Sequence, residues 1–348
     1  MENNVQIDIE MLNEIYQHLG DEKSKEMFKN RLMFSITKDE KWIIENLKIM
    51  EEGKFFISQL EKCSQNGEMV IFGVGVRGKI LYQMYKNYPW KFWIDNYSNI
   101  SEFEGIPILR TTKFLEKYHG EYIFVTPKNN NEEILEQLRQ AGVPDTKIIN
   151  VGKIQNELMK NQYFDLKYLK HSRKKEVFVD VGGYDGMTSV YFNKWSQREC
   201  FSYIFEPDKD NIKKCQKNLK KYNINYKIIQ KGAWNEEMIL NFNANGDVSS
   251  QISNAGGDMI TVSTIDKELR KEEVSFIKMD IEGAELQALI GAKNTIINNK
   301  PQLAISVYHK PEDIWEIPNI ILKYNSDYKL YLRHYTFTDA DTVLYALL

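Results

Sequence analysis

The chain has 348 residues, of which 42% are hydrophobic and 12% aromatic, and these apolar side chains suffice for two hydrophobic cores. Its net charge of −3 at pH 7 argues against a nucleic-acid-binding surface. No apolar run approaches the roughly 20 residues that span a bilayer, and the acidic residues 1–10 lack the apolar segment of a signal peptide. Three cysteines are too few and too scattered for a disulfide framework or a zinc cluster. We therefore expect a cytoplasmic enzyme with two domains and no membrane span.

Residues 1–65 are expected to form a helical extension. Leu12, Ile15 and Leu19 share one face at helical spacing, and a second apolar stripe follows within residues 43–50. Such faces pack on neighbouring structure, and the segment contains no candidate catalytic or ligand-binding residues.

Residues 66–152 predict a small Rossmann-like domain. Four short strands are expected in it, at residues 69–72, 92–94, 122–125 and 147–149. Glycines with the spacing G-x-G-x-x-G follow the first strand, at Gly73, Gly75 and Gly78. Asp95 follows the second strand, where an acidic side chain can bind a ribose.

Two interpretations of this first domain remain open. The glycines and Asp95 would suit the ribose of an adenosine or of a nucleotide sugar, and the stretch 105–109 resembles small Rossmann-like domains attached to sugar-modifying enzymes. Alternatively, the glycines only allow close packing of strand and helix, and the domain is structural or pairs two chains as a homodimer. A hydride-transfer role has little support, because no second catalytic set follows the first strand–helix–strand unit.

Residues 153–175 are expected to be a linker, and residues 176–348 form the larger second domain. It opens with a buried strand that carries Asp180, followed by a turn at Gly182 and Gly183 and then a helix. Backbone N–H groups of such a turn are expected to face outward, where they can bind a carboxylate or a phosphate.

The next apolar run, at residues 203–205, ends in Glu206 and Pro207. An acidic residue at this point can accept hydrogen bonds from both hydroxyls of a ribose. No phosphate-binding lysine follows the glycines, so the ligand is not expected to be rich in phosphate. S-Adenosylmethionine, an adenosine with a sulfonium and an amino-acid tail, fits these features.

Polar or glycine residues follow three further predicted strands, which lie at 226–229, 276–279 and 303–307. They are Gly232-Ala233-Trp234, Asp280 to Gly283, and Tyr308 to Lys310. Trp234 would form a wall for an adenine ring. Ligands of open parallel sheets bind outside the carboxyl ends of the strands, so we expect these residues to share one site.

Two other segments are expected to be peripheral. The helix at 208–222 has a core stripe that includes Cys215 and Leu219, while its lysines face water. Residues 240–262 predict a β-hairpin insertion whose Ser- and Asn-rich loops, including Ser249-Ser250, lie near the site or are ordinary surface loops.

On these residues the second domain resembles the FkbM family of S-adenosylmethionine-dependent methyltransferases. The matching segments are residues 180–186, 205–207, 249–250, 264–266 and 277–286. The last, Lys-x-Asp-x-Glu-Gly-x-Glu after a strand, is the most specific. The chain has Gly-Gly-Tyr where the family usually has Gly-Ala-Asn, which leaves the turn intact but alters the contacts of Tyr184. The resemblance implies the class I methyltransferase fold, an α/β fold with a doubly wound, mostly parallel sheet.

The resemblance also implies a cofactor and a substrate class. Family members commonly methylate hydroxyl groups of sugars or natural products, often in polysaccharide biosynthesis. The residues expected to bind S-adenosylmethionine here are Asp180, Gly182, Gly183, Tyr184, Glu206, Pro207, Gly232, Ala233, Trp234 and Asp280.

Methyl transfer to a hydroxyl is an in-line displacement that needs a positioned nucleophile and a base for its proton. Asp280 is expected beside the methyl group, and Glu282 and His309 are the candidate bases, because imidazole titrates near pH 6.5. The alternative role of Asp280 and Glu282 is to hold Mg²⁺ through carboxylate oxygens.

The sequence thus predicts an O-methyltransferase acting on a sugar or glycan precursor, with an accessory Rossmann-like domain. Two alternatives are a nucleotide-sugar-binding protein with a degenerate methyltransferase scaffold and an NAD(P)-dependent oxidoreductase that uses the first domain. Intact Asp180, Glu206 and Asp280 count against the first alternative. The missing hydride-transfer residues count against the second.

Overall fold

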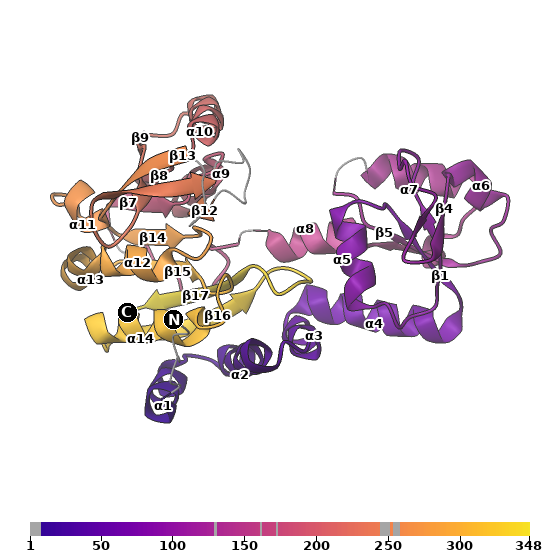
Figure 1. Cartoon of the computed structure of the whole chain (residues 1–348), viewed down its shortest axis with the longest axis horizontal. Coiled ribbons are helices and arrows are strands. Elements are labelled where there is room, and N and C mark those ends of the chain that lie inside the picture. The colour runs from indigo at the N-terminus through magenta and orange to yellow at the C-terminus, as the bar shows by residue number, and fades with distance from the viewer. Residues whose placement is uncertain (1–7, 129–130, 161, 172, 244–250, 253–257) are drawn as a thin grey trace. The chain divides into compact units, whose positions relative to one another are not determined.

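The computed structural model describes residues 8–128, 131–160, 162–171, 173–243, 251–252 and 258–348 (Figure 1). The chain divides into two compact units. Unit 1 comprises residues 1–37, 161–333 and 341–348, and unit 2 comprises residues 38–160 and 334–340.

These units differ from the boundaries expected from the sequence. The helices of the expected extension are shared out: α1 (Ile9–His18) and α2 (Glu22–Thr37) belong to unit 1, whereas α3 (Lys41–Ile49) and α4 (Glu51–Asn66) belong to unit 2. The expected linker 153–175 is also structured at its start, because most of helix α8 (Val151–Met159) lies in it. Apolar periodicity shows that a helix has a buried face, but not which core that face joins.

The start of α2 and the connection between α1 and α2 are anchored on strand β16 (Lys329–His334) by polar contacts, among them the N–H of Gly20, which donates to the carbonyl of Leu330 at 2.8 Å. The Ser24 hydroxyl accepts the Leu332 N–H at 3.0 Å, and the Arg333 guanidinium pairs with Asp21 at 2.6 Å. Both Ser24 and Arg333 are buried. The amino-terminal helices are therefore part of the unit 1 core and not a loose extension.

Unit 2 is built around a sheet with the strand order β3-β4-β2-β1-β5-β6 in its described residues. The strands are β1 (Met69–Phe72), β2 (Trp90–Ile94), β3 (Glu102–Phe103), β4 (Ile106–Leu109), β5 (Tyr122–Val125) and β6 (Ile148–Asn150). All pair in parallel except β3 with β4. Its further helices are α5 (Val76–Met84), α6 (Thr111–Leu115) and α7 (Asn131–Gln140).

The glycine turn of unit 2 is packed tightly against its own backbone. A Cβ added at Gly78 would collide with the carbonyl oxygen of Gly73. The carboxylate of Asp95 accepts the N–H groups of Val74, Tyr97 and Ser98 at 2.8–2.9 Å. These contacts give both the glycines and Asp95 a structural role in the turn.

Unit 1 contains the predicted doubly wound, mostly parallel sheet. Across the described residues its strand order is β16-β17-β15-β14-β7-β8-β9. The other strands are β7 (Lys175–Val181), β8 (Glu199–Phe205), β9 (Tyr226–Ile229), β14 (Phe276–Met279), β15 (Gln302–Ser306) and β17 (Thr342–Leu347). In this sheet the neighbouring strands β15, β14, β7, β8 and β9 run in parallel, and β17 is antiparallel to β15. The α/β fold class and this sheet type are confirmed.

The helices of unit 1 bury apolar side chains against this sheet. They are α9 (Met187–Ser196), α10 (Lys209–Lys221), α11 (Ile265–Glu268), α12 (Glu285–Ile290), α13 (Lys293–Asn299) and α14 (Asp313–Tyr324). Phe178 of β7 stacks on Phe192 of α9 with ring centroids 4.2 Å apart. Such layers of helix on sheet leave the strand ends free to carry polar side chains.

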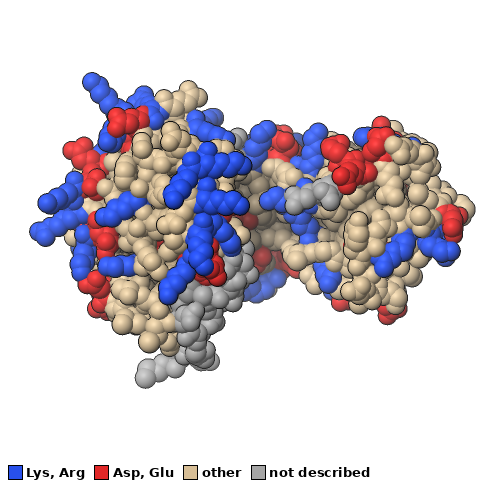
Figure 2. All heavy atoms as spheres, turned by 90° about the horizontal axis from the view of Figure 1, so that it is seen from above, with Lys and Arg blue, Asp and Glu red and all other residues tan. Residues whose placement is uncertain are grey.

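Helix α10 has the two faces that the sequence predicts. Cys215 and Leu219 are fully buried, whereas Lys213, Lys217 and Lys220 are exposed. Figure 2 looks down on this side of unit 1 and shows Lys and Arg side chains projecting from the surface. The lysines are therefore solvated, as expected for an amphipathic surface helix.

A small sheet follows β9 and contains the predicted hairpin insertion. Its strands are β10 (Gly232–Ala233), β11 (Met238–Asn243), β12 (Gln251–Ile252) and β13 (Asp258–Ser263), and β11 is antiparallel to β13. The expected loops, including Ser249-Ser250, lie outside the described residues. In the part of the chain that the structure describes, no helix is long and apolar enough to cross a bilayer.

Candidate active site

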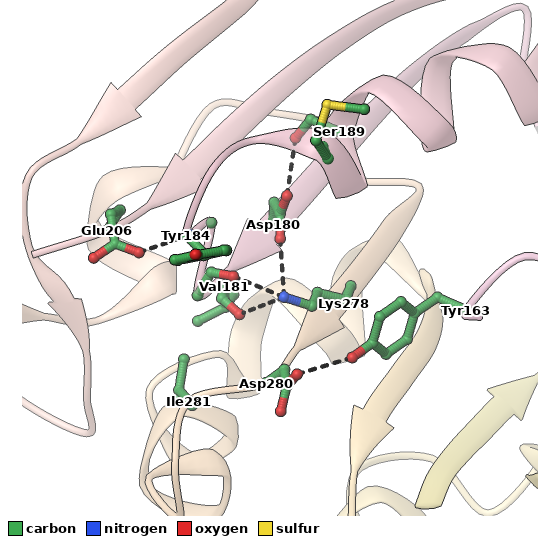
Figure 3. A network of polar contacts seen from close by, with 12 residues as sticks. Tyr163, Asp180, Val181, Tyr184, Ser189, Glu206, Lys278, Asp280 and Ile281 are labelled. Carbon is green, nitrogen blue, oxygen red and sulfur yellow. Dashed lines mark hydrogen bonds and ion pairs between the residues drawn. The ribbon is translucent and has the colours of Figure 1, made fainter. Parts of the chain in front are cut away.

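The parallel strands of unit 1 bring the predicted polar residues to one edge of the sheet. Strands β7, β8, β14 and β15 are parallel neighbours, so their carboxyl ends lie together. Asp180, Glu206, Asp280 and His309 lie in or just beyond these ends. Figure 3 shows the first three with polar contacts that each of them makes. This edge is the candidate active site.

The glycine turn after β7 is pressed against both neighbouring strands. Gly182 has φ +85°, and a Cβ there would collide with the carbonyl oxygen of Asp280, while a Cβ at Gly183 would collide with Ile204. The N–H groups of Gly182 and Gly183 both donate to the carbonyl of Phe205, at 3.0 and 3.2 Å. The prediction that these groups face outward to bind an anion is wrong, because the turn passes close enough to β8 to use them internally.

Glu206 is fixed by two backbone N–H donors. Its Oε2 accepts the N–H of Tyr184 at 2.8 Å and its Oε1 accepts the N–H of Asp208 at 2.9 Å. The residue is 5% exposed, and burial raises its pKa to about 7 in spite of these bonds. Each carboxylate oxygen can accept a further hydrogen bond. The two carboxylate oxygens of Glu206 are thus hydrogen-bond acceptors in fixed positions. The next residue, Pro207, is half-buried.

A buried lysine that the sequence analysis did not single out links the turn to β14. The Nζ of Lys278 lies 3.2 Å from Oδ1 of Asp180 and donates to the carbonyl of Gly182 at 2.7 Å (Figure 3). The Ser189 hydroxyl donates to Oδ2 of the same aspartate at 3.0 Å. Burial lowers the pKa of Lys278, but the carboxylates of Asp180 and Asp280 raise it by more, so the side chain stays charged. The sequence signal for this contact was a lysine inside an otherwise apolar strand, because a buried lysine needs a charged or polar partner.

Asp280 is oriented by two tyrosines. The hydroxyl of Tyr163 donates to its Oδ2 at 3.0 Å and the hydroxyl of Tyr308 donates to its Oδ1 at 3.1 Å. The Asp280 side chain remains 25% exposed. Tyr163 precedes β7, so sequence position gave no sign of this contact. Two phenolic donors thus orient the partly exposed Asp280 carboxyl group.

His309 lies among carboxylates. Its Nδ1 is 3.0 Å from Oε1 of Glu285, and its Nε2 is 3.6 Å from Oδ1 of Asp280 and also 3.6 Å from Oε2 of Glu282. Burial lowers its pKa, but these carboxylates, Glu285 first, raise it to about 9. The imidazole therefore carries a positive charge at neutral pH. The sequence predicted that Asp280, Glu282 and His309 lie together, but it gave Glu285, the last residue of the same motif, no role in the site.

A comparison with protein families found a match that covers the strand ends described above. Residues 180–338 match the family model described as the methyltransferase FkbM domain. This part of the chain is therefore similar to the FkbM methyltransferase family. Methyl transfer is the activity that the match supports. A comparison with curated proteins found no match.

A solved structure agrees with this fold. The chain is similar to the methyltransferase FkbM of Methylobacillus flagellatus KT, with a TM-score of 0.52 and 21% sequence identity over 85% of this chain and 99% of that chain. It is also similar to the fibrillarin of Aeropyrum pernix, crystallised with S-adenosyl-L-methionine, with a TM-score of 0.35 and 10% identity over 55% of this chain and 74% of that chain. The first comparison supports the fold, and the second is too distant to support an inference.

A divalent cation was the alternative use of the acidic residues. Asp280, Glu285 and His309 each offer one ligand atom, and these atoms lie within 4.8 Å of one another. Mg²⁺ favours octahedral oxygen ligands and usually keeps several waters. An imidazole is one of the three donors, and both it and Glu285 are buried. These three residues therefore fit Mg²⁺ poorly. The set also contains Glu285, whereas the sequence analysis expected Glu282 to be the second carboxylate ligand beside Asp280.

The predicted adenine wall lies beside the main sheet and not in it. Gly232 and Ala233 form β10, which pairs with β13, and the N–H of Trp234 donates to the carbonyl of Ser263 at 2.9 Å. The Trp234 side chain is half-buried. Its contact with a cofactor stays a prediction.

Proposed function

We propose that this protein is an S-adenosylmethionine-dependent O-methyltransferase that acts in the cytoplasm on a hydroxyl of a sugar, glycan precursor or related natural product. One observation supports the proposal. The fixed carboxylate of Glu206, which suits a ribose, lies along the same sheet edge as the adjacent side chains of Asp280 and His309.

The cofactor side is formed by Glu206 and the turn that precedes it. Both oxygens of Glu206 keep acceptor capacity, which suits the two hydroxyls of a ribose. S-Adenosylmethionine supplies the methyl group and leaves as S-adenosylhomocysteine.

The acceptor side is formed by Asp280 and His309. Asp280 orients the acceptor hydroxyl, and the Nε2 of neutral His309 takes its proton as the new C–O bond forms. The charge balances, since the positive charge of the sulfonium is replaced by that of the imidazolium. A neutral nitrogen acceptor has less need of this arrangement, because it attacks through a free lone pair, whereas a hydroxyl loses its proton as the C–O bond forms.

Ligand binding and product analysis together test the proposal. The purified full chain is heated with S-adenosylhomocysteine, NAD⁺, NADP⁺ or a nucleotide sugar, and we expect S-adenosylhomocysteine to stabilise unit 1. A ligand at 100 times its dissociation constant adds about 2.7 kcal/mol to the free energy of unfolding. The chain is then incubated with S-adenosylmethionine and a panel of sugars and glycan precursors, and mass spectrometry is used to find a product one methyl group heavier. Stabilisation by NAD⁺ or NADP⁺ alone would favour an oxidoreductase. Stabilisation by the nucleotide sugar alone would favour a nucleotide-sugar-binding protein.

A further inference from the structure

A fully buried carboxylate, that of Glu285, lies behind the ring of His309. Its Oε1 is 3.0 Å from Nδ1, and the histidine side chain is 8% exposed. The opposite ring nitrogen, Nε2, is 3.6 Å from Asp280 and from Glu282, whose side chains are 25% and 30% exposed. The inner ring nitrogen, Nδ1, therefore faces Glu285, and the outer nitrogen, Nε2, faces the partly exposed carboxylates of Asp280 and Glu282.

Glu285 is itself held in place by the loop that carries the other acidic residues. Its Oε1 accepts the N–H of Ile281 at 2.8 Å, and Glu285 is the first residue of helix α12. The loop between them contains Glu282 and Gly283 at φ +56° and +90°. One carboxylate thus contacts both the loop after β14 and the imidazole at the end of β15.

Other charged groups near His309 have partners of their own. Asp313 accepts the N–H of Lys310 at 2.8 Å, and Asp341 accepts the side-chain N–H of Gln162 at 3.1 Å. Tyr308 stacks on the ring with centroids 4.0 Å apart and donates its hydroxyl to Asp280. Asp280 and Glu282 lie on the Nε2 side, so Glu285 is the carboxylate at Nδ1 in the described residues.

We propose that Glu285 is a positioning residue for His309, which keeps the ring proton on Nδ1 so that Nε2 presents its lone pair to the acceptor hydroxyl. The inference rests on the proposed function. A carboxylate behind one ring nitrogen selects this tautomer and stabilises the imidazolium after proton transfer. Neither ring nitrogen has a well-aligned hydrogen bond to the described residues. Such bonds often align only when substrate is bound.

Nuclear magnetic resonance of ¹⁵N-labelled histidine tests the proposal without a known acceptor. The full chain is titrated with S-adenosylhomocysteine bound, and the signal of His309 among the five histidines is assigned by its loss in His309→Gln. Above its midpoint, wild-type His309 is expected to carry its proton on Nδ1. In Glu285→Gln the midpoint falls by at least about one pH unit and the Nε2–H tautomer gains population. Glu285→Asp keeps the charge and should retain a midpoint nearer that of the wild type.

A matched control and a kinetic measurement separate positioning from structure. Asp313→Asn removes another buried carboxylate near His309, one that does not contact the ring, and should leave the tautomer unchanged. Once an acceptor is known, Glu285→Gln should lower kcat by about 10²–10⁴-fold with little change in the KM of the acceptor.

Three outcomes would overturn the proposal. One is a wild-type His309 with its proton on Nε2, an observation that does not depend on whether the Glu285 variants fold. Another is a Glu285→Gln protein with an unchanged tautomer and midpoint. The third is stoichiometric binding of added Mn²⁺ or Zn²⁺ that abolishes the titration of His309, since Glu285 would then act at a metal site. Failure of S-adenosylhomocysteine to bind the wild type would instead contradict the proposed function.

Discussion

The ammonium group of Lys278 and the carboxylate of Asp180 form an ion pair of 3.2 Å between the neighbouring strands β14 and β7, and both side chains are buried. The same ammonium donates to the carbonyl of Gly182. One side chain thereby neutralises the aspartate at the end of β7 and fixes the turn that follows it.

We expect Lys278→Met to lower the free energy of unfolding by about 3–5 kcal/mol, because it leaves the Asp180 carboxylate buried without its partner. Urea denaturation measures the loss. The double variant Lys278→Met/Asp180→Asn is the control and should recover a large part of it, since no unpaired charge remains. A single variant as stable as the wild type would show that the pair contributes nothing to folding.

Glu206→Gln should weaken the binding of S-adenosylhomocysteine by about 1.5–3 kcal/mol, the usual contribution of hydrogen bonds to a charged group. The amide keeps the size of the side chain but accepts through one oxygen only. Isothermal titration calorimetry measures the affinity. Glu199→Gln is a matched control, because Glu199 begins the same strand at its opposite, exposed end. Equal affinity in a folded Glu206→Gln protein would remove this residue from the cofactor site.

Cofactor affinity should also depend on pH through Glu206. Burial raises the pKa of this carboxyl to about 7 in the free protein, so it takes up a proton as the pH falls below 7 and loses acceptor capacity. The dissociation constant of S-adenosylhomocysteine should therefore rise by about tenfold per pH unit below pH 7 and level off above it. Calorimetry from pH 5.5 to 8.5 checks the slope, and Glu206→Gln should show none. A flat wild-type profile would contradict the raised pKa.

The rate of methyl transfer should increase with pH up to about 9. The neighbouring carboxylates, Glu285 first, offset the effect of burial and raise the pKa of His309 to about 9, so only its deprotonated fraction can accept the hydroxyl proton. Below this value kcat should fall tenfold per pH unit. His309→Ala should lower kcat by about 10²–10⁴-fold at pH 9, whereas the exposed His119 can be replaced as a control. If His309→Ala keeps full kcat, Glu282 becomes the candidate base.

S-Adenosylhomocysteine should bind once per chain. In unit 2 the carboxylate of Asp95 already accepts three backbone N–H groups, and Gly78 packs on Gly73, so the glycine turn there is explained by structure alone. Calorimetric titration should reach a stoichiometry of one in the wild type and in Asp95→Ala. A second equivalent site that Asp95→Ala abolishes would show that unit 2 also binds the cofactor.

Sequence reasoning located the sheet and its polar edge because both depend on local patterns. Apolar runs that end in Glu206 and Asp280 predict strands and mark their carboxyl ends without any knowledge of tertiary contacts. The tyrosine donor Tyr163 could not be found in this way, since 117 residues separate it from Asp280. Glu285 ends the Lys-x-Asp-x-Glu-Gly-x-Glu motif, but its contact with His309 was not predicted, because a glutamate at a helix start usually faces solvent and is explained by the helix dipole.

The glycine turn shows why a motif alone does not define a binding mode. Gly182 and Gly183 occur where a ligand-binding turn is expected, yet their N–H groups bond to Phe205. Glycine suits either of two physical demands, close packing or close approach to a ligand, and a sequence motif does not distinguish them.

The stacking of Phe337 on Phe56, with ring centroids 4.3 Å apart, has a consequence for the order of events during synthesis. Phe337 belongs to residues 334–340, which return to unit 2 after the chain has left that unit at Lys160. A ribosome must therefore translate almost the entire chain before the core around Phe56 is complete. Unit 2 should remain incompletely packed during translation, and a truncated chain of residues 38–160 should lack a core side chain that the full protein provides.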